Sequence, residues 1–437
     1  MLLNLENPQR PGTSGTTAQI FVDQTSISSV RLAAVALGGP AFKQAASPAD
    51  IVVEQLHGGI TNALFRVTAS CGTSVLVRVF GHATEIVIDR EADAAAFAAL
   101  GELGFGPRLI GSFANGRIEE FLCDVRPLEP VEMRQRAPRD FLRGIARAVA
   151  HLHGLAMPGR DAGPVLWARL TKWSQLALDA VTDNTAQSTR PRPMPSTIER
   201  AVAGIAWCEQ VLPSSRNSHG ASLLDAQATA LNGSAPQVYK SMVAHLVAPL
   251  TVPRSASRIV QARLDGMALM YATTFCHYDL LSGNVLVPAE TAQSGDEVPT
   301  VRLIDYEYSG YGYAGVDIAN HFVEVAGFSY NLATDYPPRQ DRLAWLASYA
   351  EARGAPHEIW DITRGGATAE AALHEMLHIV DSAIVASDLH WGLWACIQAR
   401  HSPIDFDYTS YAVKRLEGFL VHQQVEFQTS AARGEIK

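Results

Sequence analysis

The chain has 437 residues, an apolar content of 47% and a formal net charge of −9. This length allows one large core or two lobes. The acidic charge argues against nucleic acid as a partner, because a protein that binds the phosphate backbone needs a basic surface. An acidic balance suits a cationic small substrate, although it more often serves solubility alone.

The five cysteines form no CxxC pair. The sequence therefore predicts neither a disulfide framework nor a zinc site, and it favours a reducing compartment. The N-terminus shows no signal-peptide pattern, and no apolar window reaches the ~18 residues that a membrane span needs. We expect a cytoplasmic protein without a membrane span.

The first part of the chain alternates between strand-like and helical patterns. Residues 1–22 are polar and rich in Pro, Gly, Ser and Thr, which predicts a disordered tail. Within residues 23–127, the β-branched run 75–80 and the segment 117–122 predict strands. Segment 89–103 is rich in Ala and acidic at its start, which predicts a helix. We expect residues 23–127 to form a strand-rich N-terminal lobe.

Helical patterns dominate the second part, and we expect residues 128–437 to form a larger, mostly helical C-terminal lobe. Residues 183–257 are rich in Ser, Pro, Asn and Gln and predict an insertion with linker character. A second short segment without a structural pattern, at 290–299, separates the two motifs described next. The predicted class is α+β.

The most informative motif is His-Tyr-Asp-Leu-Leu-Ser-Gly-Asn at 277–284, followed by Leu-Ile-Asp-Tyr-Glu-Tyr at 303–308. A loop aspartate, an asparagine five residues later and an acid after the next apolar strand form the phosphoryl-transfer layout of kinase-like folds. Asp279 is predicted to orient the attacking hydroxyl. Asn284 and Asp305 are predicted to hold Mg²⁺, which prefers hard oxygen ligands. A lone loop aspartate more often caps a turn, but the spacing of all three residues favours catalysis.

Glu307 is the second acid of this segment. It lies two residues after Asp305, so on a strand both carboxylates project to the same face. Two carboxylates aimed at one place repel each other unless a cation lies between them. Glu307 is therefore predicted as a weaker metal ligand, through water or a second ion, with a solvated strand end as the alternative. Together with the order of the lobes, these motifs predict a protein-kinase-like, two-lobed fold.

From about residue 58 to residue 419 the chain resembles the choline/ethanolamine kinase family, with 183–257 as the poorly matching part. The family usually has Asn where this chain has Tyr278, whose side chain we expect to support the loop. The matching segments are the glycine turn Gly58-Gly59-Ile60-Thr61-Asn62, the catalytic loop 276–284, the metal segment 304–311 with 317–322, and the C-terminal signatures 391–394 and 404–408.

The resemblance implies that ATP and Mg²⁺ are the cofactors. It places the glycine turn over the nucleotide phosphates, and it places Arg78 where protein kinases carry a lysine. An arginine can bind phosphate oxygens through two hydrogen bonds. Its acidic partner is expected to be Glu91 or Asp93. The implied nucleotide-binding residues are Gly58, Gly59, Thr61, Asn62, Arg78, Glu119, Glu120 and Leu122.

The resemblance also implies a pocket for a cationic head group, formed by aromatic rings and one acid. The physical basis is cation–π attraction, worth about 0.5–2 kcal/mol per contact. Aromatic pairs at helical spacing, such as Trp391 and Trp394, are otherwise most often core residues. The implied substrate residues are Asp279, Tyr308, Glu324, Trp391, Trp394, Phe406, Tyr408 and Tyr411.

Segments 75–90, 279–281 and 406–408 look like the ethanolamine branch of the family. A primary ammonium group needs acceptors for its N–H donors, and Asp407 could supply one or could point to solvent. We expect an ATP-dependent ethanolamine kinase that makes phosphoethanolamine for phosphatidylethanolamine synthesis. The alternatives are a choline kinase, a kinase of dual specificity, or a non-catalytic nucleotide-binding pseudokinase. Expected partners are a small-molecule substrate and no nucleic acid, and a homodimer remains possible.

Overall fold

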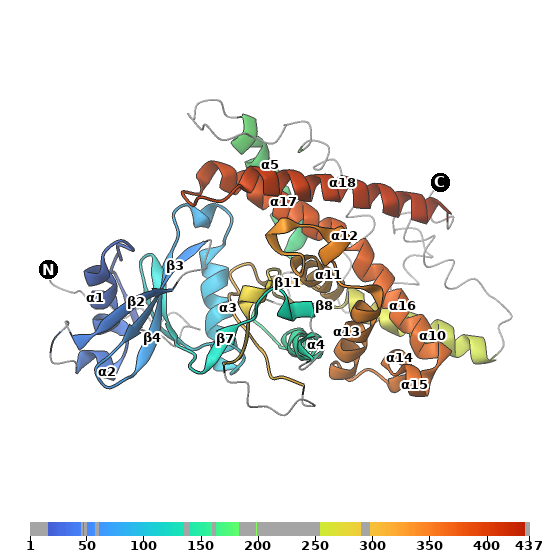
Figure 1. Cartoon of the computed structure of the whole chain (residues 1–437), viewed down its shortest axis with the longest axis horizontal. Helices are drawn as coiled ribbons and strands as arrows, with labels where there is room; N and C mark the ends of the chain where they lie inside the picture. Colours follow the sequence, from blue (N-terminus) through green and yellow to red (C-terminus); the bar gives the residue numbers. More distant parts are fainter. Residues whose placement is uncertain are drawn as a thin grey trace.

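The computed structural model shows a strand-rich N-terminal lobe and a larger helical C-terminal lobe (Figure 1). The glycine turn residues Gly58 and Gly59 lie outside the described residues, and so does almost all of the insertion near 183–257. The described residues are 16–44, 47, 50–56, 61–134, 140–159, 163–182, 198, 254–289 and 298–432.

The N-terminal lobe contains a six-stranded sheet with the order β1-β5-β6-β4-β3-β2. All neighbouring strands are antiparallel except β1 and β5, which are parallel. Helix α1 packs against the sheet, and its buried side chains join one apolar core with those of β3 and β4. The strands are β1 (Thr16–Ala18), β2 (Val52–Leu56), β3 (Asn62–Thr68), β4 (Ser74–Phe80), β5 (Leu109–Phe113) and β6 (Gly116–Glu120); the helices are α1 (Ile27–Leu37), α2 (Pro40–Lys43), η2 (Thr84–Ile86) and α3 (Arg90–Glu102).

Local sequence explains the two elements on which the site depends. In β4, Val75, Val77 and Val79 are buried at every second position, so the two-residue period of a strand places their β-branched side chains in the core. Asp89 caps α3 by accepting hydrogen bonds from two backbone N–H groups of the first turn, where Glu91 and Asp93 also suit the helix dipole. The predicted strand at 75–80 and the helix at 89–103 are confirmed, and the strand predicted at 117–122 is confirmed as far as Glu120, where β6 ends.

The expected disordered tail at 1–22 is partly wrong. Residues Thr16–Ala18 form β1 and pair in register with residues 111–113 of β5. A strand of three residues is too short to show a periodic pattern, so only the position of the β5 edge identifies it. The N-terminal lobe therefore begins earlier in the chain than we expected.

Two small antiparallel sheets begin the C-terminal lobe and position the catalytic motifs. One has the order β10-β9-β7, and the other pairs β11 with β8. The loop 277–284 connects β8 to β9, and the acids of the second motif follow β10. These strands are β7 (Val125–Pro127), β8 (Thr273–Cys276), β9 (Val285–Pro288), β10 (Arg302–Leu303) and β11 (Gly310–Tyr313).

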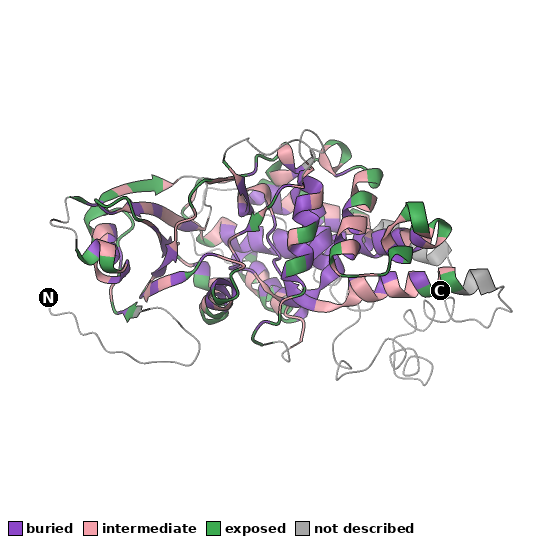
Figure 2. Ribbon diagram, turned by 90° about the horizontal axis from the view of Figure 1, so that it is seen from below, coloured by how far each residue is buried: buried purple, intermediate pink, exposed green. Residues whose placement is uncertain are grey.

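Helices supply the rest of the C-terminal lobe and most of its core (Figure 2). Helix α17 is buried on every side from Ile384 to Gln398 and packs against α5, α11 and α18. The helices are η3 (Glu132–Arg134), α4 (Phe141–Leu152), α5 (Leu166–Thr182), α10 (Arg254–Tyr271), η6 (Ser282–Asn284), α11 (Ala314–Glu324), η7 (Gly327–Ser329), α12 (Leu332–Asp335), α13 (Arg339–Ala352), α14 (His357–Trp360), α15 (Ile362–Gly365), α16 (Ala367–Ser382), α17 (Ile384–His401) and α18 (Tyr408–Ala432).

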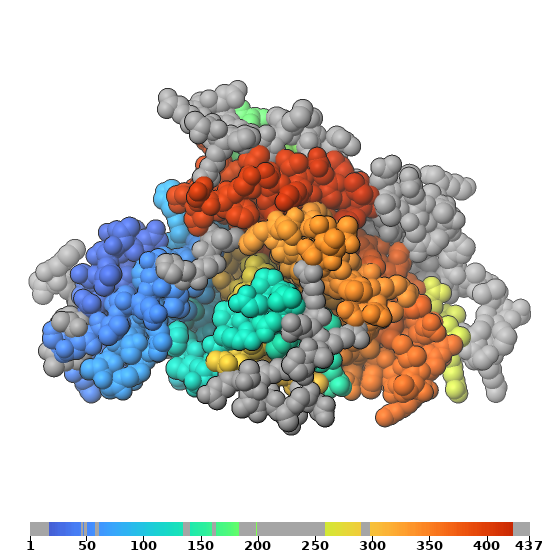
Figure 3. Space-filling model, viewed as in Figure 1, coloured from blue at the N-terminus to red at the C-terminus, as the bar shows by residue number. Residues whose placement is uncertain are grey.

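Helix α18 closes one side of the C-terminal lobe. Figure 3 shows it in red along the outer edge of the molecule, beside the orange segment that contains α12. Lys414 on α18 donates a hydrogen bond to the backbone of Ser329, which fixes this neighbouring segment. Among the helices that the structure describes, none is long and apolar enough to cross a membrane.

Candidate active site

One cavity of about 620 Å³ lies between the two lobes. Residues from β2, β3, β4 and β6 line it on the N-terminal side, and the catalytic loop, α11, α17 and α18 line it on the other side. Fourteen of the predicted site residues line this cavity: Thr61, Arg78, Glu119, Glu120, Leu122, Asp279, Asn284, Asp305, Glu307, Tyr308, Glu324, Trp391, Trp394 and Tyr411.

Asp317 on α11 supports the catalytic loop through hydrogen bonds to its backbone. The carboxylate of Asp317 accepts hydrogen bonds from the backbone N–H groups of His277 at 2.8 Å and Tyr278 at 2.7 Å. Asn320 donates to the carbonyl of Tyr278, whose φ is 63°. A tyrosine with positive φ is unfavourable by itself, so these hydrogen bonds fix the loop in a conformation that presents Asp279 to the cavity.

His153 completes this support beneath the loop. Its Nε2 lies 3.0 Å from a carboxylate oxygen of Asp317, and its Nδ1 lies 2.9 Å from the hydroxyl of Tyr349. His153, Asp317 and Cys276 bring possible metal-ligand atoms within 4.8 Å of one another. Hydrogen bonds already occupy both histidine nitrogens and both carboxylate oxygens, so we interpret this buried group as a scaffold for the loop.

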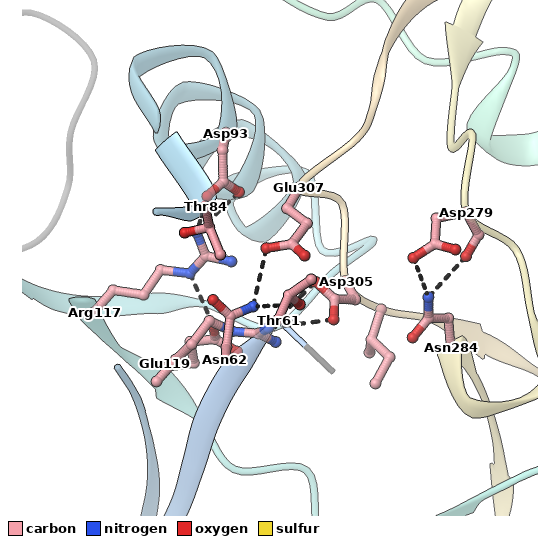
Figure 4. Close-up of polar contacts among 12 residues, drawn as sticks. Thr61, Asn62, Thr84, Asp93, Arg117, Glu119, Asp279, Asn284, Asp305 and Glu307 are labelled. Carbon is pink, nitrogen blue, oxygen red and sulfur yellow. Dashed lines mark hydrogen bonds and ion pairs between the residues drawn. The ribbon is translucent and has the colours of Figure 1, made fainter. Parts of the chain in front are cut away.

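Asp279 and Asn284 face each other across the turn of the loop, as Figure 4 shows. The amide nitrogen of Asn284 donates to the carbonyl of Asp279 at 2.7 Å and to its carboxylate at 3.1 Å. The amide oxygen of Asn284 is then the group that it could offer to a cation. Burial raises the pKa of Asp279 well above its usual range, and the negative charges of Glu324, Asp305 and Glu307 add to the effect.

Asp305 lies opposite this pair and contacts the N-terminal lobe. Its two carboxylate oxygens accept hydrogen bonds from Nη1 of Arg78 at 3.2 and 3.3 Å. Burial opposes the charge of Asp305, but the cations of Arg78 and Arg117 outweigh it and lower the pKa of the carboxyl. Asp305 is therefore an anion placed to bind a cation.

Glu307 also contacts the N-terminal lobe, which its position two residues after Asp305 did not by itself predict. Its Oε2 accepts a hydrogen bond from Nδ2 of Asn62 at 2.9 Å (Figure 4). The same oxygen accepts a hydrogen bond from Nη1 of Arg90 at 3.3 Å. Burial raises the pKa of Glu307, and the charge of Asp305 raises it further. Asn62 contacts this acid and does not line the cavity itself.

The acidic partner of Arg78 differs from our expectation. Nε of Arg78 donates to Glu119 at 2.6 Å, whereas Asp93 pairs with Arg117 at 2.9 Å. The sheet explains this arrangement, because Arg78 of β4 lies directly opposite Arg117 of β6, and Glu119 follows two residues later on the same face. The expectation of Glu91 or Asp93 was wrong.

Glu119 therefore does more than line the cavity. Its side chain is only 2% exposed and accepts from both Arg78 and Arg117. The adjoining wall of the cavity is apolar, and the sequence analysis missed its residues because aliphatic strand positions look like ordinary core. These residues are Leu64, Leu76, Leu286 and Ile304.

Aromatic rings line the opposite end of the cavity. Trp391 and Trp394 of α17 have their ring centroids 5.3 Å apart, and the Trp394 indole donates to the hydroxyl of Tyr308 at 2.9 Å. Trp391 packs edge-on against Tyr308. Phe328, which the sequence analysis missed, also lines this end and packs against Tyr411.

Two residues predicted for the substrate pocket lie behind its wall. Phe406 packs against Phe328 and Tyr411, and Tyr408 packs against Trp394, but neither Phe406 nor Tyr408 lines the cavity. They support the rings that do line it. The positions of these aromatic residues in the sequence could not separate those that line the cavity from those behind its wall.

Asp407 does not face the cavity. It is exposed, and its carboxylate accepts from the backbone N–H and the hydroxyl of Ser410, in the first turn of α18. This is the geometry of a helix cap. Of the two roles left open for Asp407, the structure supports the one at the surface.

Glu324 is the acid at the aromatic end. It lies at the last turn of α11, is 6% exposed and lines the cavity. Nη2 of Arg415 donates to its Oε1 at 2.5 Å. Burial raises the pKa of Glu324, and the cation of Arg415 offsets only part of that rise.

Solved structures identify the fold. A choline kinase of Cryptosporidium parvum superimposes with a TM-score of 0.63 at 21% identity, covering 94% of this chain and 98% of that chain. An ethanolamine kinase of Plasmodium vivax gives a TM-score of 0.59 at 20% identity, covering 95% and 93%. These likenesses show a protein-kinase-like fold and confirm the predicted two-lobed architecture.

Sequence comparison identifies the family. The choline/ethanolamine kinase profile matches residues 53–219 and 261–420, and the chain belongs to this family. A probable ethanolamine kinase of Arabidopsis thaliana is 28% identical over 379 residues, which are 86% of this chain and 80% of that protein. Ethanolamine kinase 2 of Rattus norvegicus is 28% identical over 423 residues, covering 96% and 88%. The enzyme is thus a kinase that transfers a phosphoryl group to an alcohol.

Proposed function

We propose that this protein is an ATP- and Mg²⁺-dependent ethanolamine kinase that makes phosphoethanolamine. The observation that carries the proposal is one buried acid, Glu324, at the ring-lined end of the cavity that also holds Asp279. A small amine with a terminal hydroxyl would place its cation between the acid and the rings, and its hydroxyl toward Asp279. Relatives described as ethanolamine kinases support the same substrate.

The residues at the other end of the cavity fit a metal–nucleotide complex. Asp305, Glu307 and the amide oxygen of Asn284 are hard ligands of the type that Mg²⁺ prefers. The carboxyl groups crowd one another, as the raised pKa values of Asp279 and Glu307 indicate, and a cation would relieve that repulsion. Bound Mg²⁺ would neutralise phosphate charge, while Arg78 is placed to contact a phosphate.

Asp279 is the proposed catalytic residue. As a carboxylate it would accept a hydrogen bond from the substrate hydroxyl, orient its oxygen and take its proton during transfer. Asn284 holds the carboxylate of Asp279 at 3.1 Å and so fixes its direction. The intact trio Asp279, Asn284 and Asp305 is the reason to prefer an enzyme over a pseudokinase.

Choline is the second candidate substrate. Its trimethylammonium group needs only apolar and aromatic walls, and Tyr308, Trp391, Trp394 and Tyr411 supply four such rings. Ethanolamine has N–H donors that need acceptors, which favours a pocket containing Glu324. We expect ethanolamine to be preferred by about tenfold in kcat/KM, or roughly 1.4 kcal/mol of transition-state discrimination.

A competition assay tests the substrate. Purified enzyme is given ATP, Mg²⁺ and equal concentrations of ethanolamine and choline, and the two phosphorylated products are quantified. Excess phosphoethanolamine supports the proposal, and equal or greater phosphocholine moves the enzyme to the choline branch. If neither product forms although ATP still binds, the protein is a pseudokinase. A role in phosphatidylethanolamine synthesis, a cytoplasmic location and a homodimer stay predictions.

A further inference from the structure

A buried charge cluster lies directly behind Glu324, and three helices each contribute one member. Arg415 of α18 donates to Glu324 of α11 at 2.5 Å and to Asp388 of α17 at 3.2 Å. The side chains of Arg415, Glu324 and Asp388 are 1%, 5% and 0% exposed. Only Glu324 lines the cavity, so the other two residues act on a ligand through it or through their charge.

The arginine poses an electrostatic problem for a cationic substrate. A guanidinium paired with Glu324 cancels the charge of the acid that should attract the amine. Opposite unit charges this close together interact strongly away from bulk water, so this cancellation matters. Asp388 adds a second carboxylate to the same guanidinium and leaves the cluster with one net negative charge.

The carboxylate of Asp388 is held by neighbours on both of its oxygens. Tyr330 donates its hydroxyl to Oδ1 at 2.6 Å, and Nδ1 of His422 lies 2.8 Å from Oδ2. Together with Arg415, three neighbours therefore hold the two oxygens of Asp388. Arg415 is also held in place, because its Nε donates a hydrogen bond to the hydroxyl of Tyr411 at 3.0 Å. Tyr411 itself lines the cavity.

We propose that Arg415 and Asp388 are positioning residues for the amine of the substrate: Arg415 fixes the carboxylate of Glu324, and Asp388 balances Arg415 so that the pocket keeps a net negative charge. This inference rests on the proposed function, since it takes a cationic amino alcohol as the substrate. The competing interpretation is an ion cluster that only ties α11, α17 and α18 together.

Charge-balanced variants separate the two interpretations. Asp388→Asn keeps the shape but makes the cluster neutral, so we expect the KM for ethanolamine and the Ki of propylammonium, which lacks the hydroxyl, each to rise about tenfold. The KM for ATP should stay within about twofold. Asp388→Glu keeps the charge and should recover most of the affinity. The matched control is Asp381→Asn on α16, which removes a carboxylate paired with Arg342 outside the cavity.

The double variant Asp388→Asn with Arg415→Gln is the decisive test, because it restores one net negative charge on Glu324. Charge balance predicts that it binds propylammonium more tightly than Asp388→Asn alone. A purely structural cluster predicts equal or weaker binding, a larger loss of melting temperature and a parallel rise in the KM for ATP, and that result would overturn the inference. Wild-type turnover of ethanolamine is measured first, so failure of the proposed function is seen separately.

Discussion

The proposed nucleotide end and the proposed substrate end of the cavity hold their buried acids in different ways. At the nucleotide end, Asp305 and Glu307 of the C-terminal lobe contact Arg78, Arg90 and Asn62 of the N-terminal lobe. At the substrate end, Glu324 contacts Arg415 of its own lobe. One set of contacts crosses between lobes, and the other belongs to a single helical core.

The acids at the two ends of the cavity also differ in how far their side chains are exposed. The side chain of Asp305 is 21% exposed, whereas that of Glu324 is 5% exposed and its partner Arg415 is 1% exposed. We therefore expect the contacts of Asp305 to be exchanged for contacts with the proposed metal and phosphates. The ion pair of Glu324 is buried, so we expect the substrate end to be preorganised and the nucleotide end to rearrange on binding.

The largest expected effect is on kcat, at Asp279, which lies between the two ends of the cavity. Asp279→Ala should lower kcat by about 10³–10⁴-fold, because it removes the group that orients the hydroxyl and takes its proton. Nucleotide affinity should persist, since Arg78 and the apolar wall remain. Steady-state kinetics and calorimetric titration with ATP measure the two quantities. A variant that keeps even a tenth of wild-type turnover would show that Asp279 is not the catalytic base.

Variants at the nucleotide end should come next. Asp305→Ala should lower Mg²⁺-dependent activity by about 10²–10³-fold, and Asn284→Ala should weaken it strongly, because each removes a hard oxygen ligand. Activity is measured as a function of Mg²⁺ concentration. Raised Mg²⁺ should partly rescue Asn284→Ala. Two variants that follow the wild-type curve would exclude both residues as ligands.

The meeting of Asp279, Asn284 and Asp305 in one cavity was predictable because the motif is local in sequence. Asp279, Asn284 and Asp305 lie within two short segments, and their spacing carries the prediction without a structure. The partner of Arg78 was not predictable in this way. It depends on the register of β4 against β6, which places Glu119 beside Arg78 and leaves Asp93 for Arg117.

The substrate end was predictable only in part. Trp391 and Trp394 share a helix face, so their common position followed from the sequence. Which aromatic residues line the cavity and which lie behind it depends on how α17 packs against α18, so Phe406 and Tyr408 were misplaced and Phe328 was missed. The cluster of Arg415 and Asp388 depends on the same packing, and isolated charges in helical segments give no signal of it.

Loss of an aromatic ring at the substrate end should lower the catalytic efficiency with both candidate substrates. Trp391→Ala should lower kcat/KM for ethanolamine and for choline by about 10–50-fold, because it removes a cation–π contact and opens the wall. Trp391→Phe keeps a ring and should lose less, although it also removes the hydrogen bond from the indole to Asn320. Kinetics with both substrates and with ATP check the result. A selective loss for one substrate would contradict a shared cation site.

The smallest expected effect is a shift in the pH dependence of the KM for ethanolamine, on its acidic side (the acidic limb). Burial holds the pKa of Glu324 above its usual 4.5, and Asp388 raises it further while Arg415 lowers it. Protonated Glu324 attracts a cation less, so the KM for ethanolamine should rise as pH falls through this raised pKa.

Besides these partners, the charge of Asp279 and the hydroxyl of Tyr411 face Glu324. Their contributions are the same in the wild-type enzyme and in Asp388→Asn. The substitution removes a negative charge, which lowers the pKa of Glu324 and should move the acidic limb to lower pH by a fraction of a unit. The ethanolamine KM is measured from pH 5 to pH 8 for both enzymes, with Asp381→Asn as the control. A limb that stays in place, or moves to higher pH, would show that Asp388 does not act on Glu324 through its charge.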